Sequence, residues 1–176
     1  VFSNGDEVEL FQNGSPAGRL KAGERPAADL PKSFLFDLPY VPGELTAVSY
    51  KDGAELSRDT LKAAGPVKQI RLIPEKTEMS ADGHDVIYVH VELIDEEGLT
   101  VPDSDRKLHA SVDGSGTLSA FGSANPITDE NYTSGDFTSF RGTAEAVIRS
   151  SYTAGSCTLT VSGEGLETVS VTLHTV

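Results

Sequence analysis

Apolar residues recur at every second position in several short stretches of this sequence. Residues 87–93 alternate Ile, Val, Val and Leu with Tyr, His and Glu, and residues 169–174 follow the same pattern. A period of two is typical of a β-strand with one buried face. Phe34, Phe36 and Leu38 form a third set of this kind. The chain is therefore expected to be all-β.

Turn dipeptides separate these stretches. In each of them Asn or Asp tolerates a positive φ and the following Gly adopts one freely, which suits a two-residue hairpin. Many short strands joined in this way favour β-sandwiches. Residues 163–165, Gly-Glu-Gly, are also expected to form a hairpin. The four dipeptides are Asn13-Gly14, Asp52-Gly53, Asp82-Gly83 and Asp113-Gly114.

Residues 54–64 hold the one candidate helix. They are rich in helix formers, but Leu56 and Leu61 alone would make a poor apolar stripe. Asp52-Gly53 directly before them resembles a hairpin turn that leads into a strand. We expect a strand here.

A domain boundary is expected near Gly65-Pro66, where small residues end one extended segment and Val67 begins another. Residues 1–65 hold 7 basic and 10 acidic residues, and residues 66–176 hold 7 basic and 17 acidic ones. We predict two tandem immunoglobulin-like β-sandwich domains, residues 1–65 and 66–176. The first is short beside the roughly 100 residues of such a sandwich, and its first strand is expected to be truncated.

Charge and hydropathy exclude several partners. A formal net charge of −13 repels phosphate backbones and anionic lipid surfaces, so neither nucleic acid nor a membrane surface is an expected partner. No apolar run approaches the roughly 18 residues of a membrane span. The chain begins at Val1 rather than Met, and we expect it to be a piece of a longer protein whose compartment its own termini do not reveal.

The side chains that carry metal or thiol chemistry are sparse. Cys157 is the one cysteine, and its alternation with Leu159 and Val161 predicts a small buried side chain. The four histidines are scattered, which favours satisfied surface positions over zinc ligands. The acidic runs at residues 95–97 and 103–105 match no calcium loop, so solvated loop acid is preferred. No metal or cofactor is expected.

Catalytic signatures are also missing from the sequence. There is no Gly-x-Ser-x-Gly elbow, and no histidine is placed beside a nucleophile. Glycoside hydrolysis needs two opposed carboxylates, but among 27 acidic residues some pair always looks suitable. We therefore expect no catalytic residue in this chain.

The first fourteen residues read VFSNGDEVELFQNG. They resemble the V-Y-S-N-x-D-x-V-E-L-F-x-N-G segment of bacterial β-galactosidases of glycoside hydrolase family two, which opens a small β-sandwich soon after the catalytic barrel. Residues 40–48, YVPGELTAV, resemble the Y-x-P-G-x-L-x-A-V strand of the same domain. The match continues through Asp52-Gly53 and residues 60–65.

A second stretch resembles the final bacterial immunoglobulin-like domain of those enzymes, which is similar to invasin and intimin repeats. The resemblance implies that the acid/base and nucleophile glutamates lie in a barrel upstream, since neither motif occurs in this chain. The sandwiches would then support or space that barrel, or contribute to oligomer contacts. The matching positions are Gly116–Leu118, Gly122–Pro126, Glu130–Tyr132, Phe140, Gly142 and Ala144–Arg149.

The longest stretch without a strand pattern runs from Asn125 to Ser139, and loops of about 12–15 residues are often functional. If the chain contacts a ligand or the barrel, we expect this loop to do so, with three aromatic residues as the apolar contacts. The alternative is a loop packed on its own domain. The candidate residues are Asn125, Pro126, Tyr132, Phe137 and Phe140.

Three interpretations follow. The leading one is a non-catalytic C-terminal accessory region of a β-galactosidase-like enzyme, with the catalytic barrel of the same chain as its partner. The parent enzyme is then expected to be periplasmic, secreted or at the cell surface. A second is a carbohydrate-binding module, although the chain has no Trp and tryptophan is a favoured sugar platform. A third is a cell-surface adhesin, which the lack of similarity between the two halves disfavours.

Overall fold

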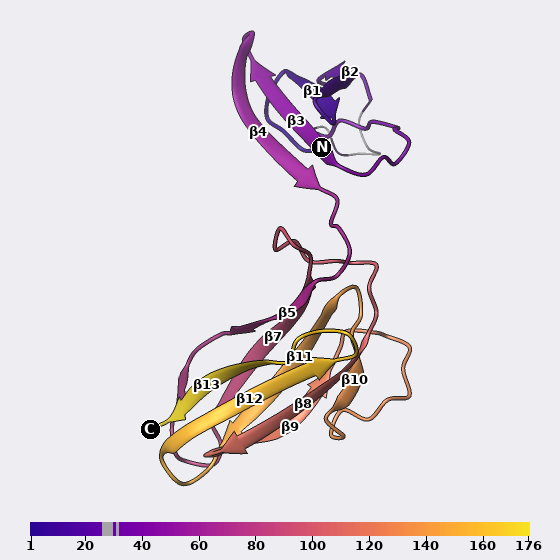
Figure 1. Cartoon of the computed structure of the whole chain (residues 1–176). Coiled ribbons are helices and arrows are strands. Elements are labelled where there is room, and N and C mark those ends of the chain that lie inside the picture. Colours follow the sequence, from indigo (N-terminus) through magenta and orange to yellow (C-terminus); the bar gives the residue numbers. More distant parts are fainter. Residues whose placement is uncertain (26–29, 31) are drawn as a thin grey trace. The chain divides into compact units, whose positions relative to one another are not determined.

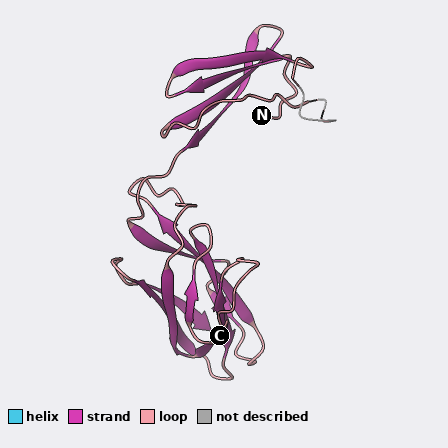
Figure 2. Cartoon of the chain, turned by 90° about the vertical axis from the view of Figure 1, so that its right-hand side faces the viewer, coloured by secondary structure: helices cyan, strands magenta, loops and turns pink. Residues whose placement is uncertain are grey.

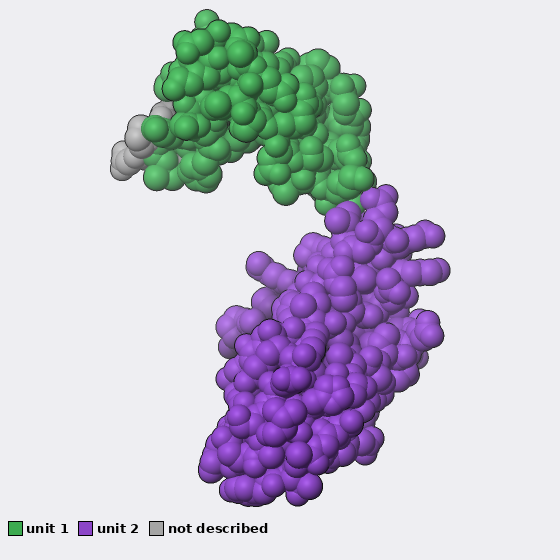
Figure 3. All heavy atoms as spheres, turned by 90° about the vertical axis from the view of Figure 1, so that its left-hand side faces the viewer, with its two compact units in different colours: residues 1–63 green, residues 64–176 purple. Residues whose placement is uncertain are grey.

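The computed structural model describes residues 1–25, 30 and 32–176, and every regular element in them is a β-strand (Figures 1 and 2). The all-β prediction is confirmed. No helix of the described residues is long and apolar enough to cross a membrane. The chain divides into two compact units, Val1–Ala63 and Ala64–Val176 (Figure 3), which are called the first and second unit below.

The first unit contains one antiparallel sheet in the order β2-β1-β3-β4. Two tight hairpins join its strands, and both central residues of each have positive φ: 51° and 76° at Asn13-Gly14, and 51° and 80° at Asp52-Gly53. These two predicted hairpins are confirmed, as is the strand that was preferred over a helix at residues 54–64. The strands are β1 (Glu7–Gln12), β2 (Ser15–Lys21), β3 (Glu44–Lys51) and β4 (Ala54–Lys62).

The strand predicted at residues 34–38 is wrong, because this segment joins no sheet. Its alternating burial is nevertheless real: Phe34 is buried, Leu35 is exposed and Phe36 is half-buried. Phe36 packs against Gly18 of β2, where an added Cβ would lie 3.1 Å from the ring. Among its described residues the first unit has one sheet, so these residues alone do not form the two-sheet sandwich expected of residues 1–65.

The second unit is a sandwich of two sheets, one in the order β10-β8-β12-β13-β6 and the other in the order β5-β7-β11-β9. All of its strand pairs are antiparallel except β13 with β6. The strands are β5 (Gln69–Pro74), β6 (Glu78–Met79), β7 (Val86–Ile94), β8 (Lys107–Gly114), β9 (Gly116–Gly122), β10 (Asp136–Thr138), β11 (Thr143–Ser150), β12 (Gly155–Gly163) and β13 (Val169–Thr175).

The core of the second unit lies between these sheets. The alternating residues of β7 that the sequence placed inward are 0 % exposed, and so is Cys157 of β12. Burial raises the pKa of the Cys157 thiol, as expected of an inert side chain in an apolar setting. Each fully buried aliphatic side chain contributes about 1.5–3 kcal/mol relative to its exposed form. The inward residues include Ile87, Val89, Val91, Leu93, Leu108, Leu159, Val161 and Leu173.

Two of the predicted hairpin turns are wrong. Asp113-Gly114 ends β8, and the next strand, β9, belongs to the opposite sheet. Asp82-Gly83 lies between β6 and β7, which also belong to different sheets. The φ preference of such a dipeptide is local, whereas the sheet that the next strand joins is decided by tertiary packing. The hairpin predicted at residues 163–165 is confirmed, because β12 and β13 pair antiparallel across it.

Candidate functional site

The predicted contact loop is the connection between β9 and β10, residues 123–135. The stretch expected to lack strands ended at Ser139, but its last part forms β10, which pairs with β8 through Phe137 and Leu108. A strand of three residues is too short to produce a visible alternation. The loop is therefore shorter than predicted, and its downstream end is fixed to the five-stranded sheet.

Phe137 is not a contact residue. It is 0 % exposed and belongs to the core between the two sheets, so its prediction as a surface contact is wrong. The neighbouring Asp136 is exposed, which places Phe137 on the inner face of β10. The Phe137 ring therefore anchors the downstream end of the loop in the core.

Tyr132 lies over Phe137, with ring centroids 4.6 Å apart and an interplanar angle of 34°. The residue remains 44 % exposed. Its backbone oxygen accepts a hydrogen bond of 2.7 Å from Phe121 N at the end of β9. Gly122 lies directly beneath the ring, where an added Cβ would come within 2.2 Å of Tyr132 Cδ1. The loop thus packs on its own domain through Tyr132 and still presents part of this ring to solvent.

The other candidate residues have separate local roles. Asn125 Oδ1 accepts a hydrogen bond of 3.0 Å from Ile127 N and fixes the turn around the exposed Pro126. This turn leaves Ile127 86 % exposed. Phe140 follows β10 and is half-buried, with the Arg141 guanidinium 5.4 Å from its ring centroid. The contact that the structure records between candidates is the ring pair of Tyr132 and Phe137.

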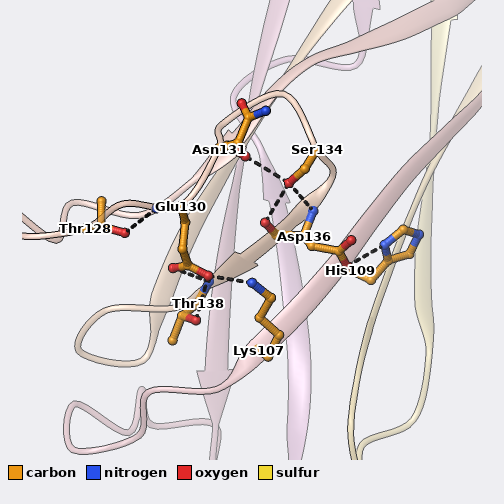
Figure 4. A network of polar contacts seen from close by, with 8 residues as sticks. All are labelled: Lys107, His109, Thr128, Glu130, Asn131, Ser134, Asp136 and Thr138. Atoms are coloured by element: carbon orange, nitrogen blue, oxygen red, sulfur yellow. Dashed lines mark hydrogen bonds and ion pairs between the residues drawn. The ribbon is translucent and has the colours of Figure 1, made fainter.

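Glu130 is the polar centre of the loop (Figure 4). Its carboxylate accepts hydrogen bonds from Lys107 Nζ at 2.5 Å, from Thr138 Oγ1 at 2.9 Å and from Thr138 N at 3.1 Å. The Lys107 ammonium, together with these Thr138 donors, holds the pKa of Glu130 below its usual value. Sequence reasoning did not assign this anchor a role, although the residue belongs to the Glu130–Tyr132 motif.

A second polar cluster lies at the downstream end of the loop, around Ser134 and Asp136 (Figure 4). The Ser134 hydroxyl lies 2.9 Å from the backbone oxygens of both Asn131 and Asp136. Asp136 Oδ1 lies 2.9 Å from His109 Nδ1 on β8. These contacts hold the end of the loop against β8 and β10.

The acidic runs that were considered for calcium bind backbone instead. Asp95 is buried and accepts hydrogen bonds from the amides of Gly65, Glu97 and Leu99 at 2.7–2.9 Å. The Gly65 N–H is the main cause that lowers the pKa of Asp95. Asp105 accepts the Arg141 amide at 2.9 Å. Within the described part of the chain, no three His, Cys, Asp or Glu residues gather as a metal site.

Comparisons with known proteins give a consistent picture. Residues 70–172 match the family described as glycoside hydrolase family 2 C-terminal domain 5, and residues 1–57 match a domain of unknown function, DUF4982. The beta-galactosidase BoGH2A of Bacteroides ovatus is 30% identical over 166 residues, which are 94% of this chain and 19% of that protein. A beta-galactosidase of Thermoanaerobacter pseudethanolicus is 30% identical over 141 residues, with 74% and 19% covered.

A solved structure extends the likeness to the whole chain. A glycosyl hydrolase family 2 member from Bacteroides cellulosilyticus superposes with a TM-score of 0.92 at 33% identity, and the match covers 99% of this chain and 22% of that protein. The chain thus spans about a fifth of the length of these relatives. The resemblance inferred from the two sequence stretches is confirmed.

Proposed function

The chain belongs to the family described as glycoside hydrolase family 2 C-terminal domain 5, and from this membership we propose that it is a non-catalytic accessory region of a β-galactosidase-like enzyme. One observation carries the proposal: 99% of the chain matches a family 2 enzyme of which it covers 22%. A segment of this kind can support or space the catalytic barrel of the same polypeptide while the reaction takes place elsewhere.

The construction of the 123–135 loop supports a role in contact. Glu130 and Tyr132 fix the loop to β8, β9 and β10, so little conformational entropy would be lost when a partner binds. Ile127, 86 % exposed, and Tyr132, 44 % exposed, present apolar surface at this site. We place the contact with the barrel here, with Asn125, Pro126, Tyr132 and Phe140 retained from the sequence prediction and Phe137 removed.

The absence of catalysis has a direct test. Residues 1–176 are incubated with nitrophenyl β-galactoside, and no release of nitrophenol above the buffer rate is expected. The full-length enzyme serves as the positive control. Turnover by the 176-residue chain that a single Glu→Gln substitution abolishes would overturn the assignment.

The contact role requires a comparison between the full-length enzyme and this chain. Ile127→Asp and Tyr132→Ala are expected to lower the thermal midpoint of the full-length enzyme more than that of residues 1–176, because only the former contains the barrel. Tyr152→Ala is the matched control, since Tyr152 is 76 % exposed and lies outside the loop. Equal shifts in both proteins would refute the contact.

The Tyr132→Ala variant also distinguishes contact with the barrel from the alternative, carbohydrate binding. Titration calorimetry of residues 1–176 with galactosides is expected to give a flat trace. Binding heat that Tyr132→Ala removes would assign the loop to a sugar instead of the barrel.

A further inference from the structure

The segment that connects the two units is fixed on its upstream side to the first unit. β4 ends at Lys62, which pairs with Glu44 of β3. The next amide, that of Ala63, donates a hydrogen bond of 2.8 Å to Gly43 O. Asn13 holds this turn in place, because its Oδ1 accepts a hydrogen bond of 2.7 Å from Glu44 N. The backbone therefore belongs to the first unit as far as Ala63, directly before the boundary in Figure 3.

The downstream side of the segment is fixed to the second unit by Asp95. The Gly65 amide donates a hydrogen bond of 2.7 Å to Asp95 Oδ2. Two residues later Val67 packs against the core of the second unit, and the Lys68 amide donates to Ile94 O at 2.8 Å. The backbone therefore belongs to the second unit from Gly65 onward.

The two oxygens of Asp95 have different partners. Oδ1 accepts hydrogen bonds from Glu97 N at 2.9 Å and Leu99 N at 2.8 Å, within the turn that follows β7. Oδ2 accepts the Gly65 amide. The residue is 4 % exposed, and a buried carboxylate is costly unless donors satisfy it. An ionised carboxylate accepts on both oxygens, whereas a carboxamide has one acceptor oxygen. Both sets of bonds together therefore require an Asp at this position.

One residue, Ala64, lies between the two anchored amides. Within the part of the chain that the structure describes, neither its N–H nor its carbonyl oxygen has a hydrogen-bond partner. The ring of Pro66 fixes its own φ and disfavours the helical region for Gly65. The φ and ψ angles of Ala64 are therefore the least restrained ones in this segment. Hinges in proteins are a few residues of this kind, which absorb changes in φ and ψ.

We propose that Ala64 is the pivot about which the two units move, and that Asp95 confines this motion to Ala64 by clamping the chain at Gly65. From Ala63 to Gly65 the extended chain spans at most about 7 Å. The pivot therefore lets the direction of the chain change while the anchored ends stay close together. The inference does not depend on the proposed function, because both anchors lie within this chain.

Nuclear magnetic resonance on residues 1–176 tests the pivot directly. The amides of Ala63 and Gly65 are expected to exchange with solvent at least about ten times more slowly, relative to their intrinsic rates, than the amide of Ala64. The ¹⁵N order parameter is expected to reach a local minimum at Ala64. Equal order and protection at all three residues would refute a pivot. Fast exchange at both Gly65 and Lys68 would show a longer mobile linker and refute the clamp.

Two single variants test the role of Asp95. Asp95→Asn can keep the Glu97 and Leu99 bonds only by turning its NH₂ group toward Gly65, so exchange at Gly65 is expected to become about ten times faster. Amides in β7 and Ala63 should keep their rates, which shows that both units remain folded. Gly65→Ala is the matched control: it retains the N–H, and its Cβ would lie 3.6 Å from Asp95 Oδ2, an ordinary contact. Unchanged exchange at Gly65 in Asp95→Asn would refute the clamp.

An insertion tests the two anchors without altering either unit. Two glycines placed directly after Ala64 lengthen the pivot and leave every anchoring group in place. Ala63 and Gly65, in the numbering of the parent chain, are expected to keep their exchange rates within about twofold, while the inserted amides exchange without protection. Loss of protection at Gly65 would show that a short connection, and not Asp95, shields this amide, and it would refute the proposal even if Asp95→Asn fails to fold.

Discussion

Replacement of Phe137 by alanine tests whether this ring anchors the loop from the core or serves as a surface contact. Phe137 is 0 % exposed and part of the core of the second unit. Removing a buried phenylalanine side chain costs about 3–5 kcal/mol, because transfer free energy is lost and a cavity remains. The Tyr132 ring, 4.6 Å away, loses its aromatic partner as well. We expect a loss of stability in the upper part of this range.

The expected shift in melting temperature follows from the size of the unit. The second unit has about 110 residues, and an unfolding entropy of about 2.1 cal/mol/K per residue gives about 0.23 kcal/mol per kelvin. For a loss of about 4–5 kcal/mol, the midpoint should therefore fall by about 17–22 °C. Scanning calorimetry of residues 1–176 reports it, and since unfolding enthalpy scales with length, the larger transition belongs to the second unit.

Ile127→Ala is the matched control for this experiment. Ile127 is in the same loop region but 86 % exposed, so its truncation should change stability by no more than about 0.5 kcal/mol, or about 2 °C. A shift for Phe137→Ala below about 4 °C, which corresponds to roughly 1 kcal/mol, would refute the buried, anchoring position of this ring.

Three further expectations follow from single sites. Glu130→Gln should speed hydrogen exchange at the Thr138 amide. Because the folded pKa of Glu130 is depressed, its stabilising contribution is present above its unfolded pKa of about 4.3 and is lost as pH falls through the folded pKa. The stabilities of the variant and the wild type should therefore converge in acid, and a difference that stays constant with pH would contradict the ion pair. Gly114→Ala should destabilise more than Gly165→Ala in urea titrations: both positions have positive φ, 97° and 71°, but a Cβ at Gly114 would lie 2.1 Å from a backbone oxygen whereas nothing lies within 4 Å at Gly165. Cys157 should resist an aromatic disulfide reagent until the protein unfolds, since burial raises its thiol pKa; rapid labelling of the native chain would show that the core opens.

The anchored loop shows how far local sequence signals reach. The sequence prediction treated Tyr132 and Phe137 alike, because the three-residue strand β10 that turns Phe137 into the core is too short to show an alternating pattern. Glu130 was missed as an anchor for a related reason. Its partners Lys107 and Thr138 lie on two strands whose proximity the chain order does not reveal.

What the sequence alone determined are the properties that neighbouring residues fix. The alternation of residues 87–93 set the buried face of β7, and positive φ at Asn13-Gly14 and Asp52-Gly53 set two hairpins. The strand at residues 54–62 and the burial of Cys157 followed in the same way. Period and φ preference act within a few residues, so they survive without knowledge of the fold.

What only the tertiary structure decided is which surfaces meet. Asp113-Gly114 has the composition of a hairpin, yet it leads β8 into a strand of the opposite sheet. Residues 34–38 alternate like a strand but belong to no sheet of the described residues; Phe34 exchanges hydrogen bonds with Val1, and the Leu35 amide donates to Arg25 O. A strand exists only when a second segment supplies its hydrogen bonds and covers its apolar face, and that segment can lie far away in the sequence.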